Sequence, residues 1–385
     1  MREVAVIGRG LSKFGERWDS GLRELVTEAA VMAITDAKIP VKSLEAIYTG
    51  SMSPGRFTNQ EHLGALVADQ LGLTPIPSTR VEAACASGGV AFRQAYISVA
   101  SGLYDLVLVT GVEKMTDVTL KSATSILGAA GDYEWEAYHG ATFPALYAMM
   151  AMRHMHEFET TEEQLALVSV KNHLNGYKNG YAHFQNPITL EEVLSSSVVA
   201  SPLKLLDCSP ISDGAAAVII ASEDVARMYT DTPVWVAASA QASDTLSLHD
   251  RESLTTLKAT KLAAREAYKQ AGIEPRDVKV AEVHDCFSIA EILAIEDLGF
   301  FEKGKGGEAT ENGETQLNSM ISVNPSGGLK ACGHPVGATG VKQIVELTTQ
   351  LRNGAGKRQV SGADIGLAQN VGGTGATCVV HILRR

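Results

Sequence analysis

The chain has 385 residues, of which 45% are hydrophobic, with five cysteines and a formal net charge of −11. This length exceeds that of one typical domain, so two or three units with sizeable cores are expected. The acidic balance excludes broad binding to nucleic acid or to an anionic membrane surface, because the positive charge that drives such binding is missing.

The amino terminus leads straight into a strand pattern over residues 4–8, without the layout of a signal peptide. No apolar run has the length needed to span a bilayer. The cysteines form an odd set without a Cys-x-x-Cys pair, which argues against a disulfide scaffold and a structural zinc site. We therefore expect a cytoplasmic protein with reduced thiols, and neither a membrane nor a nucleic acid as partner.

The first half of the chain alternates strand and helix patterns. After the first strand comes a helix with one apolar face, and a further strand is predicted over residues 46–49. Residues 105–111 form a short apolar run bounded by turn residues, which is typical of a strand buried on both faces. The apolar face of the helix consists of Leu22, Leu25, Val26, Ala29 and Ala33.

Cys85 lies among small residues, where an extended segment over residues 78–81 gives way to a helix pattern. Apolar residues repeat at helical spacing over 92–99, so the cysteine is expected at or near a helix N-terminus. There the exposed N–H groups and the helix dipole favour the thiolate, the nucleophilic form of cysteine. The alternative is a small buried core residue, as free cysteines usually are.

A long insertion, about residues 115–206, is rich in Met, His and aromatic residues and less regular in period. Such an excursion inside a compact unit is usually functional. Thr161 and Gln164 form a capping-box signature that opens a helix. His154 and His156 are two residues apart and would share a helix face poorly, so we predict no metal site there.

The same order of patterns returns after residue 232, which indicates an internal duplication of a βαβαβ-type unit. Residues 364–370 parallel residues 105–111. Residues 375–380 parallel residues 214–219 in the same way. In a duplicated α/β unit, the strand ends of both halves can share one crevice, which is where ligands bind.

Two clusters in the second half are expected to meet Cys85 in that crevice. His284 and Cys286 come directly after a predicted strand, so their side chains emerge where ligands bind. His334 precedes Pro335, which can serve as the first residue of a helix. His334 thus occupies in the second half the place of Cys85 in the first, and the two can form the pair of base and thiol nucleophile.

A third cluster is the Gly-rich turn over residues 370–375, which follows a buried strand. Turns of this kind expose backbone N–H groups that can hold a developing oxyanion. Each cluster taken singly has an ordinary structural explanation, because histidines cap turns and Gly-rich turns join strands.

Together the four clusters around Cys85, His284, His334 and Asn370 resemble the thiolase superfamily, and the resemblance runs over essentially the whole chain. The 284–287 motif and the insertion are most similar to the sterol-carrier-protein type and to archaeal acetoacetyl-CoA thiolases. The resemblance implies a duplicated α/β thiolase fold in five αβαβα layers with an inserted loop domain. Its parts would be an N-terminal half (1–114 and 207–230), the loop domain (115–206) and a C-terminal half (231–385).

The resemblance also implies roles for the matching residues. Cys85 would attack an acyl thioester, with His334 accepting its proton. Cys286 would act as the acid/base on the second substrate, whose thioester oxygen His284 and His334 would hold. The backbone N–H groups of Cys85 and Gly372 would hold the oxygen of the acyl-enzyme.

One position departs from the pattern of degradative and bacterial thiolases, which carry an acid/base cysteine where this chain has Asn370. That thiol must be replaced, and Cys286 is the candidate. The remaining cysteines are interpreted as packing residues. The basic groups considered for the phosphates of coenzyme A could equally form a solvated face: Lys258, Lys261, Arg265, Lys303 and Lys305.

The predicted activity is that of an acetyl-CoA C-acetyltransferase, which condenses two acetyl-CoA to acetoacetyl-CoA for the mevalonate route to isoprenoids. Coenzyme A thioesters are its substrates, and no cofactor or metal is expected. The alternatives are a decarboxylating condensing enzyme of the ketoacyl-synthase type and a non-catalytic acyl-CoA-binding scaffold. The resemblance further implies a homodimer or homotetramer, associated with 3-hydroxy-3-methylglutaryl-CoA (HMG-CoA) synthase and a small OB-fold, zinc-ribbon protein.

Overall fold

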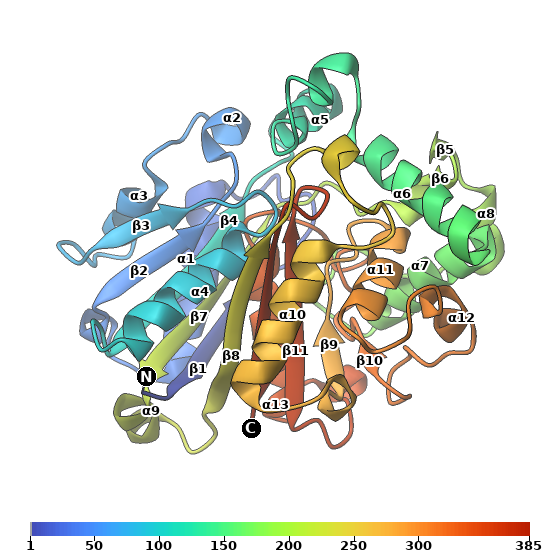
Figure 1. Cartoon of the computed structure of the whole chain (residues 1–385). Coiled ribbons are helices and arrows are strands. Elements are labelled where there is room, and N and C mark those ends of the chain that lie inside the picture. The colour runs from blue at the N-terminus through green and yellow to red at the C-terminus, as the bar shows by residue number, and fades with distance from the viewer. Residues whose placement is uncertain (1) are drawn as a thin grey trace.

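The computed structural model describes residues 2–385, and Figure 1 shows a large twisted sheet flanked by helices. The sheet has ten strands in the order β10-β9-β11-β12-β8-β1-β7-β4-β2-β3. The first half of the fold contains β1 (Val4–Leu11), α1 (Leu22–Ala37), β2 (Ala46–Gly50), α2 (Pro54–Thr58), α3 (Leu63–Gln70), β3 (Ser78–Val81), α4 (Ser87–Ala100), β4 (Leu106–Glu113), β7 (Gly214–Ser222) and α9 (Glu223–Tyr229).

The second half of the fold contains β8 (Val234–Ser243), α10 (Lys258–Ala271), β9 (Val280–Glu282), α11 (Ser288–Asp297), α12 (Gly306–Glu311), β10 (Ser322–Val323), α13 (Thr339–Leu351), β11 (Ile365–Gly372) and β12 (Thr377–Arg384). The segment between β4 and β7 forms α5 (Leu120–Gly128), α6 (Phe143–Phe158), α7 (Glu162–Tyr177), α8 (Leu190–Ser195), β5 (Val198–Ala200) and β6 (Leu203–Lys204). This segment is drawn in green in Figure 1, with α5 at the top and α6, α7 and α8 at the right.

The two halves repeat one topology, which confirms the predicted duplication. Strands of the first half lie in the order β1-β7-β4-β2-β3, and those of the second in the order β8-β12-β11-β9-β10. The matching pairs also agree in direction: β7 is antiparallel to β1 and β4, as β12 is to β8 and β11. The halves join where β1 pairs with β8 over two residues. The boundaries of the three predicted units stay a prediction.

Helices cover and separate the two halves of the sheet in five layers. The apolar face of α1 is buried against the first half, as predicted from its spacing. The apolar face of α10 covers the second half. Between them α4 and α13 share a central core, to which Phe92, Val341 and Ile344 contribute together with residues of both halves of the sheet. The central helices therefore bring the start of α4 and the start of α13 to the same place.

The start of α13 differs from the prediction that Pro335 is the first helical residue. The helix begins at Thr339, and residues 335–338 form a separate turn in which the Pro335 carbonyl oxygen accepts the Ala338 N–H at 2.9 Å. The same carbonyl oxygen also accepts the Thr339 N–H at 3.1 Å, so this turn leads directly into the helix. The Gly337 N–H donates to the carboxylate of Glu113, at the end of β4, at 3.2 Å, which links the turn to the other half of the fold.

Glycines allow the starts of the two central helices to touch. A Cβ added to Gly340 would lie 2.1 Å from the Gly89 backbone nitrogen, and one added to Gly88 would lie 2.6 Å from the Gly337 carbonyl oxygen. The backbones of α4 and α13 are thus in direct contact at the end where Cys85 and His334 lie. No other residue type fits such an approach.

The substitution Gly340→Ala is expected to destabilise the protein, although alanine in a helix ordinarily stabilises by about 1 kcal/mol relative to glycine. The new methyl group would force the two helices apart, at a cost of about 1–3 kcal/mol. The free energy of unfolding in denaturant measures the effect. Gly180→Ala is the matched control, because a Cβ there meets nothing within 4 Å. An equal effect of both substitutions would contradict the prediction.

Candidate active site

One cavity of about 440 Å³ collects the predicted chemical groups. Cys85, Cys286 and His334 line it, together with Gly373 of the Gly-rich turn. The rest of the wall is largely apolar and comes mainly from the segment between β4 and β7. It includes Met115, Leu120, Leu127, Phe143, Pro144, Tyr147, Val199, Leu205, Ile211, Phe287 and Val336.

Cys85 is half-buried and lies two residues before α4. The preceding residue, Ala84, has a φ of +52°, a left-handed conformation that non-glycine residues adopt only when their surroundings enforce it. Here the Ser87 hydroxyl enforces it, because it donates to the Ala84 carbonyl oxygen at 2.6 Å and accepts the Ala83 N–H at 2.9 Å. This sharp turn directs the thiol toward the second half of the fold.

The two predicted histidines reach the same point from the second half. One ligand atom each of Cys85, His284 and His334 lies within 4.8 Å of the others, and the two imidazole rings meet edge to face at 5.0 Å. His334 contacts the Thr339 hydroxyl through Nδ1 at 2.7 Å. The Ser212 hydroxyl accepts its backbone N–H at 3.3 Å. The structure therefore brings a thiol together with two imidazoles that lie about 200 and 250 residues further along the sequence.

Cys286 stands beside them because a buried carboxylate fixes the segment that follows β9. Asp285 is fully buried, and it accepts the Leu329 N–H at 2.7 Å and the amide of Asn172, on α7, also at 2.7 Å. Burial raises the pKa of Asp285, and the nearby Glu291 carboxylate raises it further. This network ties α7 of the inserted segment to the residues that carry the chemistry.

The charge states of the groups follow from burial. Burial raises the pKa of the Cys85 thiol to about 12, against the smaller opposing effect of the Gly373 N–H. Burial lowers the pKa of His334 to about 3 and that of His284 well below its usual value. Burial thus outweighs the helix N-terminus, which favours the thiolate. Cys85 is a neutral thiol, and it needs a base.

Gly372 and Gly373 both lie against the turn that carries Cys85. A Cβ added to Gly372 would lie 2.5 Å from the Ala83 carbonyl oxygen, so this glycine packs directly against the turn that carries Cys85. The neighbouring Gly373 lines the cavity, and its N–H is the backbone donor that lowers the pKa of the Cys85 thiol. The oxyanion role of Gly372 stays a prediction, and Gly373 joins it as a second donor at the site.

Two residues of the cavity wall, Tyr147 and Cys208, have no signal in the sequence that places them there. Tyr147, on α6, is buried, and its hydroxyl donates to the Gly373 carbonyl oxygen at 3.0 Å. Its ring lies 4.7 Å from that of Phe287. Only the fold shows that this helix reaches the site. Cys208, interpreted as a packing residue from the sequence, also lies in the cavity wall.

Glu113, by contrast, had a signal that could have been used, since it is the one acid at the end of an otherwise apolar strand. It is fully buried and holds the backbone N–H groups of Met52, Ser53 and Gly337. Burial raises the pKa of this carboxyl to about 7. The carboxyl thus links the end of β4 to the turn after His334.

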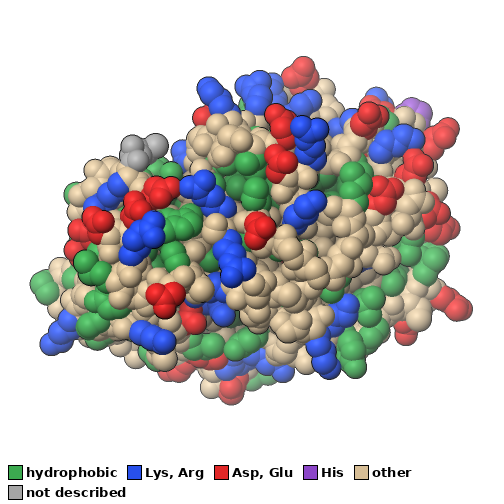
Figure 2. Space-filling model, turned by 90° about the horizontal axis from the view of Figure 1, so that it is seen from below, with side chains coloured by type: hydrophobic (Ala, Val, Ile, Leu, Met, Phe, Trp, Pro, Cys, Tyr) green, Lys and Arg blue, Asp and Glu red, His purple; other side chains and the backbone are tan. Residues whose placement is uncertain are grey.

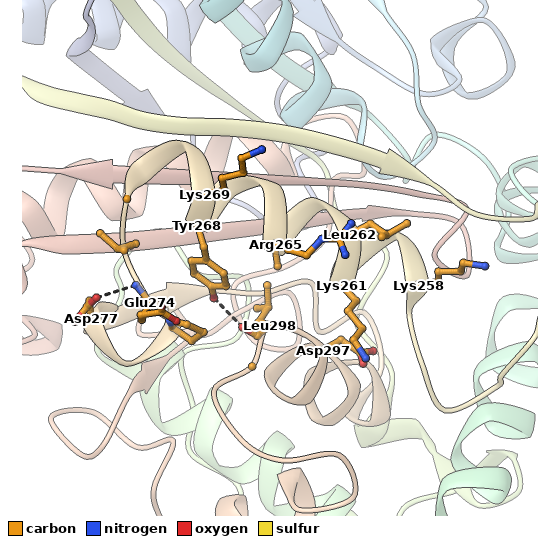
Figure 3. A pocket seen from close by; sticks show the side chains of 15 residues that line it. Lys258, Lys261, Leu262, Arg265, Tyr268, Lys269, Glu274, Asp277, Asp297 and Leu298 are labelled. Atoms are coloured by element: carbon orange, nitrogen blue, oxygen red, sulfur yellow. Dashed lines mark hydrogen bonds between the residues drawn. The ribbon is translucent and has the colours of Figure 1, made fainter.

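The basic residues considered for coenzyme A lie elsewhere. Lys258, Lys261 and Arg265 are exposed on one face of α10, where they line a hollow of about 830 Å³ that Cys85 does not line (Figure 3). Lys303 forms ion pairs with Glu296 at 3.1 Å and Asp297 at 2.8 Å, so its charge is already paired within the protein.

The remaining predictions concern metals, thiols and membranes. His154 is buried between Thr160 at 2.8 Å and Glu296 at 3.1 Å, while His156 is exposed, so the two do not converge on one point. All five cysteines are free thiols. Within residues 2–385, no helix is both long and apolar enough to cross a bilayer.

On the face shown in Figure 2, basic and acidic side chains are interspersed.

Two thiols and one imidazole on a single cavity, with a second imidazole buried beside them, define a class of acyl-transfer enzyme between duplicated α/β halves. The family models agree: "Thiolase, N-terminal domain" matches residues 4–224 and "Thiolase C-terminal domain-like" matches residues 240–385. The chain belongs to the thiolase family, and it is an acyltransferase.

Individual relatives show which members of the family the chain is similar to. The chain is 59% identical to an acetyl-CoA acetyltransferase of Methanothermobacter thermautotrophicus, over the full length of both proteins. It is 36% identical to sterol carrier protein 2 of Gallus gallus, over 98% of this chain and 71% of that protein. Among solved structures, the Ltp2-ChsH2(DUF35) aldolase is similar with a TM-score of 0.86 and 25% identity, over 98% of this chain and 97% of that one.

Proposed function

We propose that this thiolase is an acetyl-CoA C-acetyltransferase, which joins two acetyl-CoA into acetoacetyl-CoA and coenzyme A. The observation that carries the proposal is the presence of two thiols, Cys85 and Cys286, on one cavity beside His334. A nucleophile and a separate acid/base are what a reaction with two acyl-transfer steps needs. The archaeal relative of the same length supports acetyl-CoA as the substrate.

In the first half-reaction the Cys85 sulfur attacks the thioester carbonyl of acetyl-CoA. His334 takes the thiol proton as the carbon–sulfur bond forms and returns it to the departing sulfur of coenzyme A. Backbone N–H groups of Cys85, Gly372 and Gly373 are the donors available to the oxyanion. The products are acetyl-Cys85 and free coenzyme A.

In the second half-reaction His334 accepts the thiol proton of Cys286 at Nε2, and the resulting Cys286 thiolate removes a proton from the methyl group of another acetyl-CoA. The Nε2–H groups of His284 and of the protonated His334 hold the oxygen of the resulting enolate. The enolate carbon attacks the acetyl-Cys85 carbonyl, and the tetrahedral intermediate collapses with expulsion of the Cys85 sulfur. His334 passes its Nε2 proton to that sulfur, and Cys286 keeps the methyl proton, so both thiols and the imidazole return to their neutral forms as acetoacetyl-CoA is completed.

Mass spectrometry of the intact protein after incubation with acetyl-CoA tests this proposal. The expected result is one acetyl group per chain, mapped to Cys85 and absent from Cys85→Ala. Release of acetoacetyl-CoA by the wild type, followed by its absorbance with magnesium, reports the second step. A protein that acquires no acetyl group, or a Cys85→Ala variant that still turns over, would rule the proposal out.

We further propose a cytoplasmic homo-oligomer that feeds isoprenoid synthesis and binds HMG-CoA synthase together with a small OB-fold, zinc-ribbon protein. Condensation by this route is uphill, so passing the product directly to the next enzyme draws it forward. Support for a small partner comes from the solved aldolase in which Ltp2 is paired with the DUF35 protein ChsH2. Purification of the native protein from its own cells tests the proposal, and recovery of the chain alone would contradict it.

Tyr147→Phe is expected to lower turnover about 3- to 10-fold, the effect of losing one ordinary hydrogen bond. Burial raises the pKa of Cys286, and the Tyr147 hydroxyl opposes this shift when its hydrogen turns from the Gly373 carbonyl oxygen to the Cys286 thiolate. Without the hydroxyl, the apparent pKa of Cys286 rises, so the rise of the condensation rate with pH moves to higher pH. The pH profile of turnover measures this, and the rate of Cys85 acetylation is the control because it does not use Cys286.

A further inference from the structure

Asn370 occupies the position at which the pattern of other thiolases has a catalytic cysteine, and the structure gives its amide three partners. Its Oδ1 accepts the Gly89 N–H at 3.2 Å. Its Nδ2 donates to the Cys85 carbonyl oxygen at 3.1 Å and lies 3.1 Å from Nδ1 of His284. The side chains of Asn370 and His284 are buried, and they lie between α4 and the end of β9.

The orientation of this amide is fixed by its backbone partners. A backbone N–H can only donate and a carbonyl oxygen can only accept, so a flipped amide would set two donors and two acceptors against each other. The NH₂ group therefore faces Cys85 and His284. It has two hydrogens, one for each of these partners. Nδ1 of His284 must then be an acceptor, which places the proton of the neutral ring on Nε2.

A second observation shows where that proton points. Nε2 of His284 is buried and has no hydrogen-bond partner among the described residues, although buried polar atoms are almost always paired. The ring lies against His334, within 4.8 Å of the Cys85 and His334 ligand atoms. A neutral N–H without a partner at the reacting centre can donate a hydrogen bond to an oxygen of the substrate.

His334 has the opposite arrangement. The Thr339 hydroxyl donates to the Pro335 carbonyl oxygen at 3.2 Å, so at 2.7 Å it accepts from Nδ1 of His334. The proton of neutral His334 is then on Nδ1, and Nε2 offers a lone pair. One histidine of the site is thus arranged as a donor and the other as a base, and the difference comes from an amide beside one and a hydroxyl beside the other.

We infer that Asn370 is a positioning residue which, by donating to Nδ1 of His284, fixes His284 as the Nε2–H tautomer and keeps it an oxyanion donor rather than a base. An imidazolium has no lone pair for the amide to reach, so the same bond also opposes protonation of His284. The role in turnover rests on the proposed acetyl transfer, whereas the proton positions do not.

Neutron diffraction from a deuterated crystal of the wild-type protein tests the proton positions directly. The expected result is deuterium on Nε2 and not on Nδ1 of His284, and on Nδ1 of His334. Deuterium on Nδ1 of His284 would overturn the inference. This result is independent of any activity, so a protein that failed to make acetoacetyl-CoA would refute the proposed function and leave the tautomer measurement standing.

Two substitutions separate positioning from packing. Asn370→Asp keeps the shape of the side chain but faces Nδ1 with an acceptor, so it favours the wrong tautomer. Asn370→Ala removes the side chain and leaves the tautomer free. If Asn370 acted only by filling space, aspartate would be the milder change. We expect the aspartate variant to lose at least as much condensation rate as the alanine variant, on the order of 10²- to 10³-fold, as when one oxyanion donor is removed.

The matched readout is the single-turnover rate of Cys85 acetylation, which uses the backbone donors and His334 instead of His284. It should fall much less than condensation in Asn370→Asp. Near wild-type condensation by Asn370→Asp, or an equal loss in both half-reactions, would overturn the inference.

Discussion

Cys286→Ser is expected to form acetyl-Cys85 at a near-normal rate and then to stall, with condensation reduced about 10²- to 10⁴-fold. Serine is close to cysteine in shape, so the cavity should survive. A hydroxyl is a far weaker base than a thiolate for removing a proton from acetyl-CoA. Quenched-flow mass spectrometry measures acetylation, and release of acetoacetyl-CoA measures condensation.

The same substitution separates the proposed reaction from decarboxylating condensation, in which loss of carbon dioxide makes the carbanion and no base is needed. An enzyme of that kind would keep its condensation rate with Cys286→Ser. Cys378→Ser is the matched control, because this buried thiol accepts a hydrogen bond from Thr260 at 3.3 Å and serine can replace it there. Parallel loss in both variants would mean that the effect comes from packing instead.

The duplication explains how much of this site the sequence could predict. Matching residues 105–111 with 364–370 placed β4 and β11 correctly, and from this followed the expectation that Cys85 and His334 meet. Strand periodicity and turn residues indicate the positions of strands from the local sequence alone. In a repeated unit each strand position is indicated twice, once in each half. The meeting of the two central helices through Gly88 and Gly340 could not be predicted, because the sequence does not show which glycines touch.

The charge state of Cys85 and the role of Asn370 could not be predicted from the sequence, because both depend on burial. The helix N-terminus before α4 favours a thiolate at Cys85, but removal of water from the site outweighs it and leaves the thiol neutral. Asn370 shows the same limit. From the sequence it is a missing cysteine, while in the structure it is a donor held by two backbone groups. Tertiary partners decide both cases, and no local pattern encodes them.

His334→Ala is expected to change both the rate of Cys85 acetylation and its dependence on pH. With a Cys85 pKa of about 12, the thiolate fraction at pH 7 is on the order of 10⁻⁵, so direct ionisation supplies little nucleophile. In the wild type, His334 takes the proton during attack, and its pKa of about 3 keeps it neutral and able to do so. Loss of this base should slow acetylation about 10²- to 10⁴-fold at pH 7.

The sign of the pH effect follows from the two shifts. Between the lowered pKa of His334 and the raised pKa of Cys85, neither group changes charge, so wild-type acetylation should be nearly flat from about pH 5 to pH 9. In His334→Ala only the ionised thiol reacts, and the rate should rise about tenfold per pH unit over the same range. His156→Ala, on the exposed face of α6, is the control and should follow the wild type. Parallel profiles for His334→Ala and the wild type would show that another group takes the proton. Because the only lone pair of neutral His284, on Nδ1, already accepts from Asn370, that group would have to come from outside the Cys85, His284 and His334 cluster.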